Sequence, residues 1–381
     1  LSPKQYVFNF LSRNKSVTYE NLALRDADYG ADINRWYTEL VRKDIGFDLP
    51  IDKPPPPMFT PYKVGNLTLQ NRVVVAPMCQ YSADDGTPMD WHLVHLGNFA
   101  KGGAGLVITE MTNVSPEGRI SHKCTGMYKP EHVRAWKRVV DFVHENSNSK
   151  ICLQLGHAGR KASCNIGWVD GGSPLKDGSW SILAPSPIPF NSNGQIPREM
   201  DRADMDKVRD DYVRSASMAA EAGFDMIEFH GAHGYLLSSF ISPISNIRVD
   251  EYGGSLENRM RFPVEVLRAV RDVWPIDKPI SVRISAEDWV GERGVSGDDA
   301  VEISKIFYDN GADIIHVSAG QTSSEQKPIY GRMFQAHLSE QVRLEAGIPT
   351  MTVGNITTPD QVNTILAAGR ADLVTLARPH L

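Results

Sequence analysis

Short runs of β-branched and other apolar residues recur along the chain after residue 57, and each is followed by a longer amphipathic stretch. Because these runs are continuously apolar rather than alternating, they are typical of buried parallel strands. The strands predicted in this way span residues 72–77, 105–110, 150–156, 225–231, 279–285, 312–320, 349–355 and 371–379.

The segments between the apolar runs have helical periodicity. Residues 130–146 place apolar side chains at positions 133, 136, 139, 140 and 143, which lie on one face of a helix. Residues 296–310 and 358–368 each begin near a polar capping residue and are also predicted helices. Strands alternating with helices in this order predict a (β/α)₈ TIM barrel. A doubly wound sheet is the alternative, but the expected G-x-G-x-x-G is absent after the first strand.

The first 50 residues are polar and weakly patterned, and residues 54–57 are four consecutive prolines. Such a proline run favours a stiff extended segment that separates domains. We therefore expect residues 1–57 to be a linker and the end of a preceding domain, and residues 58–381 to be the barrel. The chain begins at Leu1 and ends at Leu381 directly after the eighth predicted strand. We expect a fragment, truncated after strand 8, that lacks the eighth helix and barrel closure.

Composition narrows the class of protein. The 381 residues include 40 Lys and Arg against 46 Asp and Glu, a net charge of −6, which gives no support for a nucleic-acid or membrane-surface partner. No apolar run approaches the ~20 residues of a membrane span, and no signal peptide opens the chain. We expect a cytoplasmic enzyme. The cysteines are scattered without a C-x-x-C pair, which argues against a disulfide scaffold or a metal site: Cys79, Cys124, Cys152 and Cys164.

In a barrel of this kind the active site lies where the strands end, so polar residues at those positions are candidates for chemistry. The last two strands end in a pattern suited to a phosphate group. Gly354 and Asn355 offer backbone N–H groups at a turn, and Arg378 offers a charge. Gly354 alone is equally consistent with a plain tight turn, and Arg378 with a surface ion pair. Their joint position favours phosphate binding.

His230 and His233 end the fourth predicted strand in an H-x-x-H pattern. They are candidates for a metal site, for structural histidines, or for a pair of donors to one anionic or carbonyl oxygen. A metal is the weakest of these, because no good third ligand lies nearby in the sequence. Tyr235 follows in the same loop and is placed to supply a proton.

Three further strand-end residues each have two interpretations. Arg283 carries a charge on a buried strand and needs either a bound anion or a buried carboxylate such as Glu228. Gln154 offers a donor and an acceptor, either to the edge of a heterocycle or to a core network. Cys79 follows strand one and is by itself consistent with a small buried hydrophobe.

With these residues in place, the sequence from about residue 59 to residue 381 resembles the Old Yellow Enzyme family of flavin mononucleotide (FMN)-dependent ene-reductases. The resemblance rests on APMCQYSA (76–83), QLGHAGRKA (154–162), FHGAHGYLLSSFISPISNIRVDEYGGSLENR (229–259), VRISAED (282–288) and ADLVTLARP (371–379). The stretches 16–37, 117–128 and 321–335 also resemble fused aromatic-CoA flavoenzymes of the salicylyl-CoA 5-hydroxylase and 2-aminobenzoyl-CoA monooxygenase/reductase type.

The family resemblance implies roles for individual residues. His230 and His233 would hold a substrate oxygen, Tyr235 would donate the proton, and Tyr81 and Lys161 would line the substrate side. Gln154 and Arg283 would hold the pyrimidine edge of the flavin. Met111 stands where family members usually have a small residue. The complete set of implied FMN contacts is Pro77, Met78, Cys79, Met111, Gln154, Arg283, Gly320, Gly354, Asn355, Ala377 and Arg378.

The resemblance also implies a reaction, in which NADH or NADPH reduces FMN and hydride then passes to an activated alkene. The acceptor would be an enone or a dearomatised aromatic-CoA, within a bifunctional hydroxylase/oxidoreductase. The covalently fused monooxygenase domain would carry FAD in the half absent here, and a homo-oligomer is possible. Two alternatives stay open, namely a 2,4-dienoyl-CoA reductase-like enzyme and a non-catalytic flavin-barrel scaffold for a fused hydroxylase.

Overall fold

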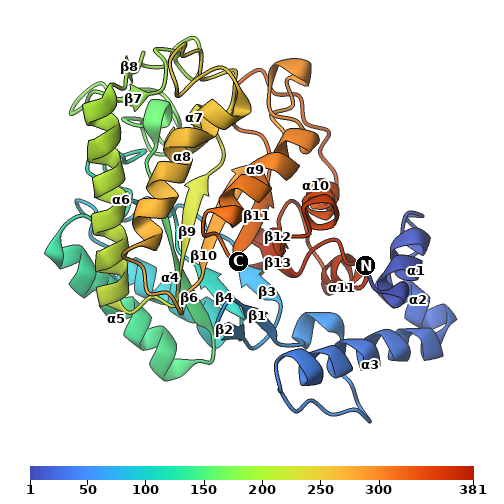
Figure 1. Ribbon diagram of the computed structural model, residues 1–381. Helices are drawn as coiled ribbons and strands as arrows, with labels where there is room; N and C mark the ends of the chain where they lie inside the picture. Colours follow the sequence, from blue (N-terminus) through green and yellow to red (C-terminus); the bar gives the residue numbers. More distant parts are fainter.

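The computed structural model describes residues 1–381, and its centre is a ring of eight parallel strands (Figure 1). The ring closes because β13 pairs with β3 and β4 pairs with β6. The predicted TIM barrel is confirmed, and the expectation that its strands would not close is wrong. The barrel strands are β3 (Val73–Val75), β4 (Leu106–Ile108), β6 (Lys150–Gly156), β9 (Met226–Gly231), β10 (Ile280–Ser285), β11 (Ile314–Ser318), β12 (Thr350–Thr352) and β13 (Leu373–Leu376).

Helices surround the ring and bury their apolar faces against it. In α5 the predicted positions from Val133 to Val143 are buried, and Trp136 is fully enclosed. Capping boxes at Asp201 and Ser296 begin two of the helices. The barrel helices are α4 (Asp90–Lys101), α5 (Pro130–Asn146), α6 (Arg202–Ala222), α7 (Leu236–Ile241), α8 (Leu256–Arg271), α9 (Gly297–Asp309), α10 (Ala336–Gln341) and α11 (Pro359–Ala367).

A hairpin covers the lower end of the barrel, where the strands begin. It consists of β1 (Tyr62–Val64) and β2 (Leu67–Leu69), which pair in antiparallel fashion. Val64 and Leu69 are buried with apolar side chains from the barrel interior in one cluster. The remaining short strands lie in the loops and are β5 (Thr112–Asn113), β7 (Leu183–Ala184) and β8 (Arg198–Glu199). The lower end is therefore filled by apolar contacts, and the upper end, where the strands finish, is left to the loops.

Three helices precede the barrel and pack beside α11: α1 (Pro3–Leu11), α2 (Tyr19–Arg25) and α3 (Ala27–Asp44) (Figure 1). Phe8, Ile33 and Tyr37 are buried in a core shared with α11. The Tyr37 hydroxyl donates to the Leu366 carbonyl at 2.5 Å, and Asn9 Nδ2 donates to the Ala368 carbonyl at 2.9 Å. Most of residues 3–44 is thus helical and packed beside α11, unlike the linker expected there. The sequence did not indicate these helices because few and irregularly spaced apolar residues make their contacts. That they end a preceding domain stays a prediction.

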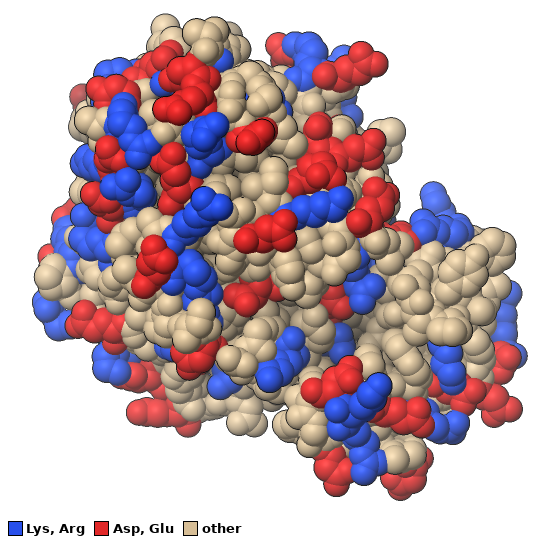
Figure 2. Space-filling model, viewed as in Figure 1, with Lys and Arg blue, Asp and Glu red and all other residues tan.

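Charged side chains of both signs are interspersed over the face of the molecule shown in Figure 2, without a large area of a single sign. The distribution agrees with the small net charge of −6. None of the helices combines the length and the apolar character that a membrane span requires.

Candidate functional site

Two cavities open among the loops that follow the barrel strands. The first, here called the β12–β13 cavity, has a volume of about 850 Å³. Five of the residues predicted to contact FMN line it together: Arg283, Gly354, Asn355, Ala377 and Arg378. The sequence did not single out most of its other lining residues, which are Tyr330, Phe334, Gln335, Val353, Ile356, Thr357, Thr375, Leu376 and Pro379, together with Ser318.

The turn after β12 forms part of the wall of this cavity. Gly354 has φ +120°, and a Cβ atom there would lie 2.8 Å from Gln335 Oε1, so only glycine fits. Asn355 also has a positive φ of 49°, and its side chain donates to the Gly331 carbonyl at 3.1 Å. Turns of this kind point backbone N–H groups into a concave space that suits an anion.

Arg283 reaches the same cavity from β10. Its side chain is 7% exposed, and its Nε has no hydrogen-bond partner. Burial lowers the pKa of the guanidinium, and the charge of Glu228 partly opposes that effect. A buried cation with an unpaired donor beside an open cavity fits an anionic or electron-rich ligand such as a flavin. The residues present therefore fit the predicted cofactor.

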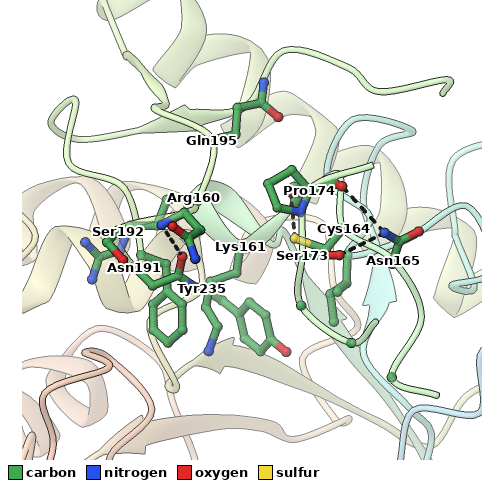
Figure 3. A pocket seen from close by; sticks show the side chains of 18 of the residues that line it. Arg160, Lys161, Cys164, Asn165, Ser173, Pro174, Asn191, Ser192, Gln195 and Tyr235 are labelled. Carbon is green, nitrogen blue, oxygen red and sulfur yellow. Dashed lines mark hydrogen bonds between the residues drawn. The ribbon is translucent and has the colours of Figure 1, made fainter. Parts of the chain in front are cut away.

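The second cavity, here called the β6–β9 cavity, has a volume of about 510 Å³ and is lined by Tyr81 among others. Lys161 and Tyr235 also line it (Figure 3). Lys161 Nζ donates to the carbonyls of His233 (2.9 Å) and Gln321 (3.1 Å). The same nitrogen lies 5.1 Å from the ring centroid of Tyr235. Burial, and then the charge of Arg160, lower the pKa of Lys161 to about 7.

His230 and His233 lie between the two cavities. The His230 ring is 4.7 Å from that of Tyr235, which lines the β6–β9 cavity, and 5.0 Å from that of His233. His233 Nε2 lies 2.8 Å from Ser318 Oγ, and Ser318 lines the β12–β13 cavity. The predicted catalytic residues thus connect the predicted cofactor side with the predicted substrate side.

The turn that carries these residues requires unusual backbone geometry. His233 has φ 61°, and Gly234 has φ 70°. A Cβ at Gly234 would lie 2.9 Å from the Gln321 carbonyl and from Thr322 Cα, so the loop after β11 packs directly on this turn. Tyr235 then occupies the N-cap position of α7, which begins at Leu236. The close approach of the two loops places the histidines and the tyrosine at one point of the barrel mouth.

The protonation states of these side chains follow from their surroundings. Burial, reinforced by the positive charge of Arg283, holds the pKa of both histidines well below the usual value, so they are neutral at pH 7. His230 Nδ1 accepts from the Ala232 N–H at 3.3 Å, which places the ring proton on Nε2. Burial raises the pKa of Tyr235 well above its usual value and keeps the phenol protonated. No group of three potential ligands gathers for a metal ion.

The other predicted cofactor residues lie around the mouth in different settings. Cys79 packs with Tyr81 and Tyr235 against a cluster that contains Met111, and burial raises the pKa of the Cys79 thiol. A Cβ at Gly156 would lie 2.5 Å from Met111 Cγ, so the glycine makes room for the larger side chain. Pro77 and Met78 are half-buried after β3.

Gly320 is set apart from the other predicted phosphate residues. A Cβ added to it would clash with Gln326 Oε1 and lie 3.0 Å from the Trp289 ring, so that side of Gly320 is covered. It is not among the residues that line the β12–β13 cavity. Thr375, a polar lining residue that the sequence analysis passed over, does carry a signal, because it lies two residues beyond the inward-facing Leu373 on β13. Ser318, which ends β11 and was a strand-end candidate, lies two residues beyond His316 in the same way.

Comparisons with known proteins agree with this geometry. Residues 57–381 match the sequence profile of the NADH:flavin oxidoreductase / NADH oxidase family. The chain is 44% identical over 326 residues to the NADPH dehydrogenase of Geobacillus sp. (strain WCH70), covering 85% of this chain and 90% of that protein. The NADPH dehydrogenase of Clostridium acetobutylicum is 41% identical, with 85% and 91% covered.

Solved structures of similar fold include two reductases. Morphinone reductase superposes with a TM-score of 0.71 at 27% identity, over 85% of this chain and 86% of that one. A 2-naphthoyl-CoA reductase in complex with 2-naphthoyl-CoA superposes with a TM-score of 0.74 at 25% identity, over 85% of this chain and 50% of that one.

Proposed function

The chain belongs to the NADH:flavin oxidoreductase / NADH oxidase family and is an FMN-dependent oxidoreductase of the Old Yellow Enzyme type, and within that class we propose that it is an ene-reductase. The electron donor we propose is NADPH, in line with the names of its relatives. The acceptor is an alkene conjugated to a carbonyl group. The observation that carries the proposal is the neutral His230–His233 pair located between the two cavities.

The β12–β13 cavity would hold the ribityl phosphate of FMN through Gly354, Asn355, Ala377 and Arg378, with Gly320 close by. The pyrimidine edge would meet Arg283 and Gln154. The residues proposed to line the ring are Pro77, Met78, Cys79 and Met111. The chemistry that bound FMN supplies is hydride transfer between a nicotinamide and an alkene.

The chain's own residues would polarise the alkene and protonate it. His230 presents Nε2–H, which no protein group accepts, and that proton would be donated to the carbonyl oxygen of the substrate. For His233, the Ser318 hydroxyl can donate to Nε2 and leave Nδ1–H for the same oxygen. Tyr235 keeps its proton at neutral pH and would transfer it to the α-carbon of the substrate. Tyr81 and Lys161 would line the substrate.

The acceptor we propose is an enone or a dearomatised aromatic-CoA thioester. Both have a carbonyl oxygen for the histidines, and the β6–β9 cavity of about 510 Å³ has room for more than a small enone. The structural similarity to a reductase bound to 2-naphthoyl-CoA supports the thioester. In that case a monooxygenase domain fused to this chain would supply the substrate.

The test is anaerobic NADPH consumption by the FMN-loaded protein with 2-cyclohexen-1-one as acceptor. We expect consumption to depend on the enone and to match the saturated ketone formed, one to one. The thioester alternative is compared with the same assay on a dihydro-aromatic-CoA. If NADPH were consumed only in the presence of oxygen, and with neither alkene as acceptor, the proposal would be contradicted. That result would favour a scaffold that binds flavin but reduces no alkene.

A further inference from the structure

A fully buried carboxylate lies inside the barrel directly behind the proposed cofactor site. Glu228 of β9 is 0% exposed and accepts three hydrogen bonds from three different strands. Gln154 Nε2 donates to its Oε1 at 2.8 Å. Ser281 Oγ and His316 Nδ1 meet its Oε2 at 3.0 Å and 2.8 Å. The register explains the arrangement, because β9 pairs Glu228 with Gln154 on one side and with Ser281 on the other.

Glu228 remains ionised in this setting. Burial opposes the charge, but the hydrogen bond from His316 and the positive charge of Arg283 outweigh it and lower the pKa of the carboxyl. Burial lowers the pKa of His316, which is therefore a neutral ring that donates from Nδ1. A buried carboxylate of this kind is weak as a source of stability, since an apolar residue of similar size would often stabilise as much. Its contacts suggest a different reason for its presence.

The contact with Gln154 determines which way that side-chain amide faces. A carboxylate accepts hydrogen bonds only, so the Gln154 nitrogen must point at Glu228 and the Gln154 oxygen must point away from it. The reverse orientation would place two acceptors against each other in a dry interior, which is strongly unfavourable because neither would have a hydrogen-bond donor. Gln154 therefore offers an acceptor to whatever lies beyond it.

We propose that Glu228 is a positioning residue, which fixes the amide of Gln154 so that its oxygen receives the single N–H group of the flavin pyrimidine ring. That edge of FMN has one N–H between two carbonyl groups, so an amide free to rotate would match it in either orientation. The fixed amide selects ligands that have the N–H. The inference rests on the proposed cofactor role of Gln154.

The first test compares the binding of FMN and of N3-methyl-FMN, which lacks that N–H, to the apoprotein. We expect the native protein to bind FMN about tenfold more tightly than the methylated form, as for the loss of one buried hydrogen bond. In Glu228→Gln the new amide can either accept or donate a hydrogen bond, so Gln154 is no longer held in one orientation. The ratio of the affinity for FMN to that for N3-methyl-FMN should then fall at least threefold. The matched control is Glu110→Gln, which alters another buried carboxylate, paired with His92 at 2.9 Å and out of contact with Gln154. Its ratio should equal that of the native protein.

The second readout is the reduction potential of bound FMN. Glu228→Gln removes a buried negative charge, which favours the added electrons; a tenfold preference for the reduced form corresponds to a rise of about 30 mV. Ser281→Ala keeps the charge and should leave the potential near the native value. Glu228→Asp keeps the charge but moves it away from Gln154, so the binding ratio should fall while the reduction potential stays near the native value. If Glu228→Gln does not fold, this variant still tests whether Glu228 orients Gln154.

The outcomes separate the two proposals. A native protein that discriminates between the flavins, with the same ratio in both Glu228 variants, would overturn the positioning role and leave the proposed function intact. A native protein that binds neither flavin would overturn the proposed function itself. Equal binding of both flavins by the native protein would show that Gln154 does not receive the N–H, and would also overturn the positioning role.

Discussion

The two ends of the barrel interior are built from the same strands but from opposite kinds of residue. On β9, Met226 is followed two positions later by Glu228, and on β11, Ile314 is followed by His316. Met226 and Ile314 belong to the apolar cluster that the β1–β2 hairpin closes, whereas Glu228 and His316 are hydrogen-bonded to each other. Because alternate residues of a strand face the same side, one step of two residues changes the interior from apolar to polar.

The difference indicates which end stabilises the molecule and which end performs chemistry. The lower end is a cluster of buried apolar side chains. The upper end has buried polar atoms without partners, among them Arg283 Nε, His316 Nε2 and Thr375 Oγ1. Unpaired buried groups cost stability, and functional sites are where proteins retain them. Substitutions at the two ends should therefore affect different properties.

The largest effect is expected from removing the histidine pair at the upper end. His230→Ala with His233→Ala should lower enone reduction about a thousandfold, in line with the loss of oxyanion donors, and should change the melting temperature little. Anaerobic reduction of the bound flavin by NADPH should stay within a few-fold, because it does not use the substrate carbonyl. The control is His144→Ala, on the outer helix α5, which should reduce the enone at the native rate. A double variant that still reduces the enone would contradict the role of the pair.

At the lower end, Leu373→Ala should act on stability alone. Leu373 of β13 is 0% exposed in the apolar cluster, and the cavity left by truncation costs about 2–5 kcal/mol of unfolding free energy. Urea unfolding measures this, while FMN affinity per folded molecule should be unchanged. Leu24→Ala, at an 85% exposed position on α2, should change stability by less than about 0.5 kcal/mol. Weakened FMN binding by the folded Leu373→Ala protein would contradict the prediction that the lower end affects stability alone.

A smaller effect is expected at the phosphate end of the β12–β13 cavity. Arg378→Ala removes an exposed cation, and its loss should weaken FMN binding about tenfold, as for one charge-assisted hydrogen bond. Riboflavin, which lacks the phosphate, should bind both proteins equally. Arg378→Lys should lie between them. If Arg378→Ala weakened riboflavin and FMN equally, Arg378 would not contact the phosphate.

The smallest effect concerns pH and Lys161, at the edge of the β6–β9 cavity. Its pKa is lowered to about 7, mainly by burial, so between pH 7 and 10 the unfolded chain holds a proton at Lys161 that the folded chain has lost. Stability then rises with pH relative to Lys161→Met, which does not titrate. Denaturant unfolding of both proteins at pH 7 and pH 9 measures the difference. If the free energy of unfolding of the native protein, relative to that of Lys161→Met, stayed constant or fell from pH 7 to pH 9, the lowered pKa would be contradicted.

The sequence predicted elements well where periodicity was strong. The bounds of α5 and β6 agree with the predicted residues 130–146 and 150–156 at both ends, because each has a regular burial pattern with a clear stop. The N-terminal helices were not predicted, since their stability depends on contacts with α11 that lie more than 300 residues away. Such contacts leave almost no local pattern.

The candidate site was predictable in part for the same reason. The ends of parallel strands meet at one edge, so Arg283, Gly354 and Arg378 could be grouped before their contacts were known. The pattern of apolar and polar residues along the sequence does not show how the loops fold back over that edge. Gly320 is consequently covered by Trp289, and Gln335 enters the cavity from a loop more than a dozen residues beyond β11.

The most direct test of the account is an anaerobic titration of the FMN-reconstituted protein with NADPH, followed by the visible absorption of the flavin. We expect one FMN per chain and complete bleaching by about one equivalent of NADPH, because Arg283 and the β12–β13 cavity fit the cofactor. Addition of the enone should then restore the colour without oxygen. A protein that stays colourless after reconstitution, or a bound flavin that NADPH does not bleach, would contradict the account.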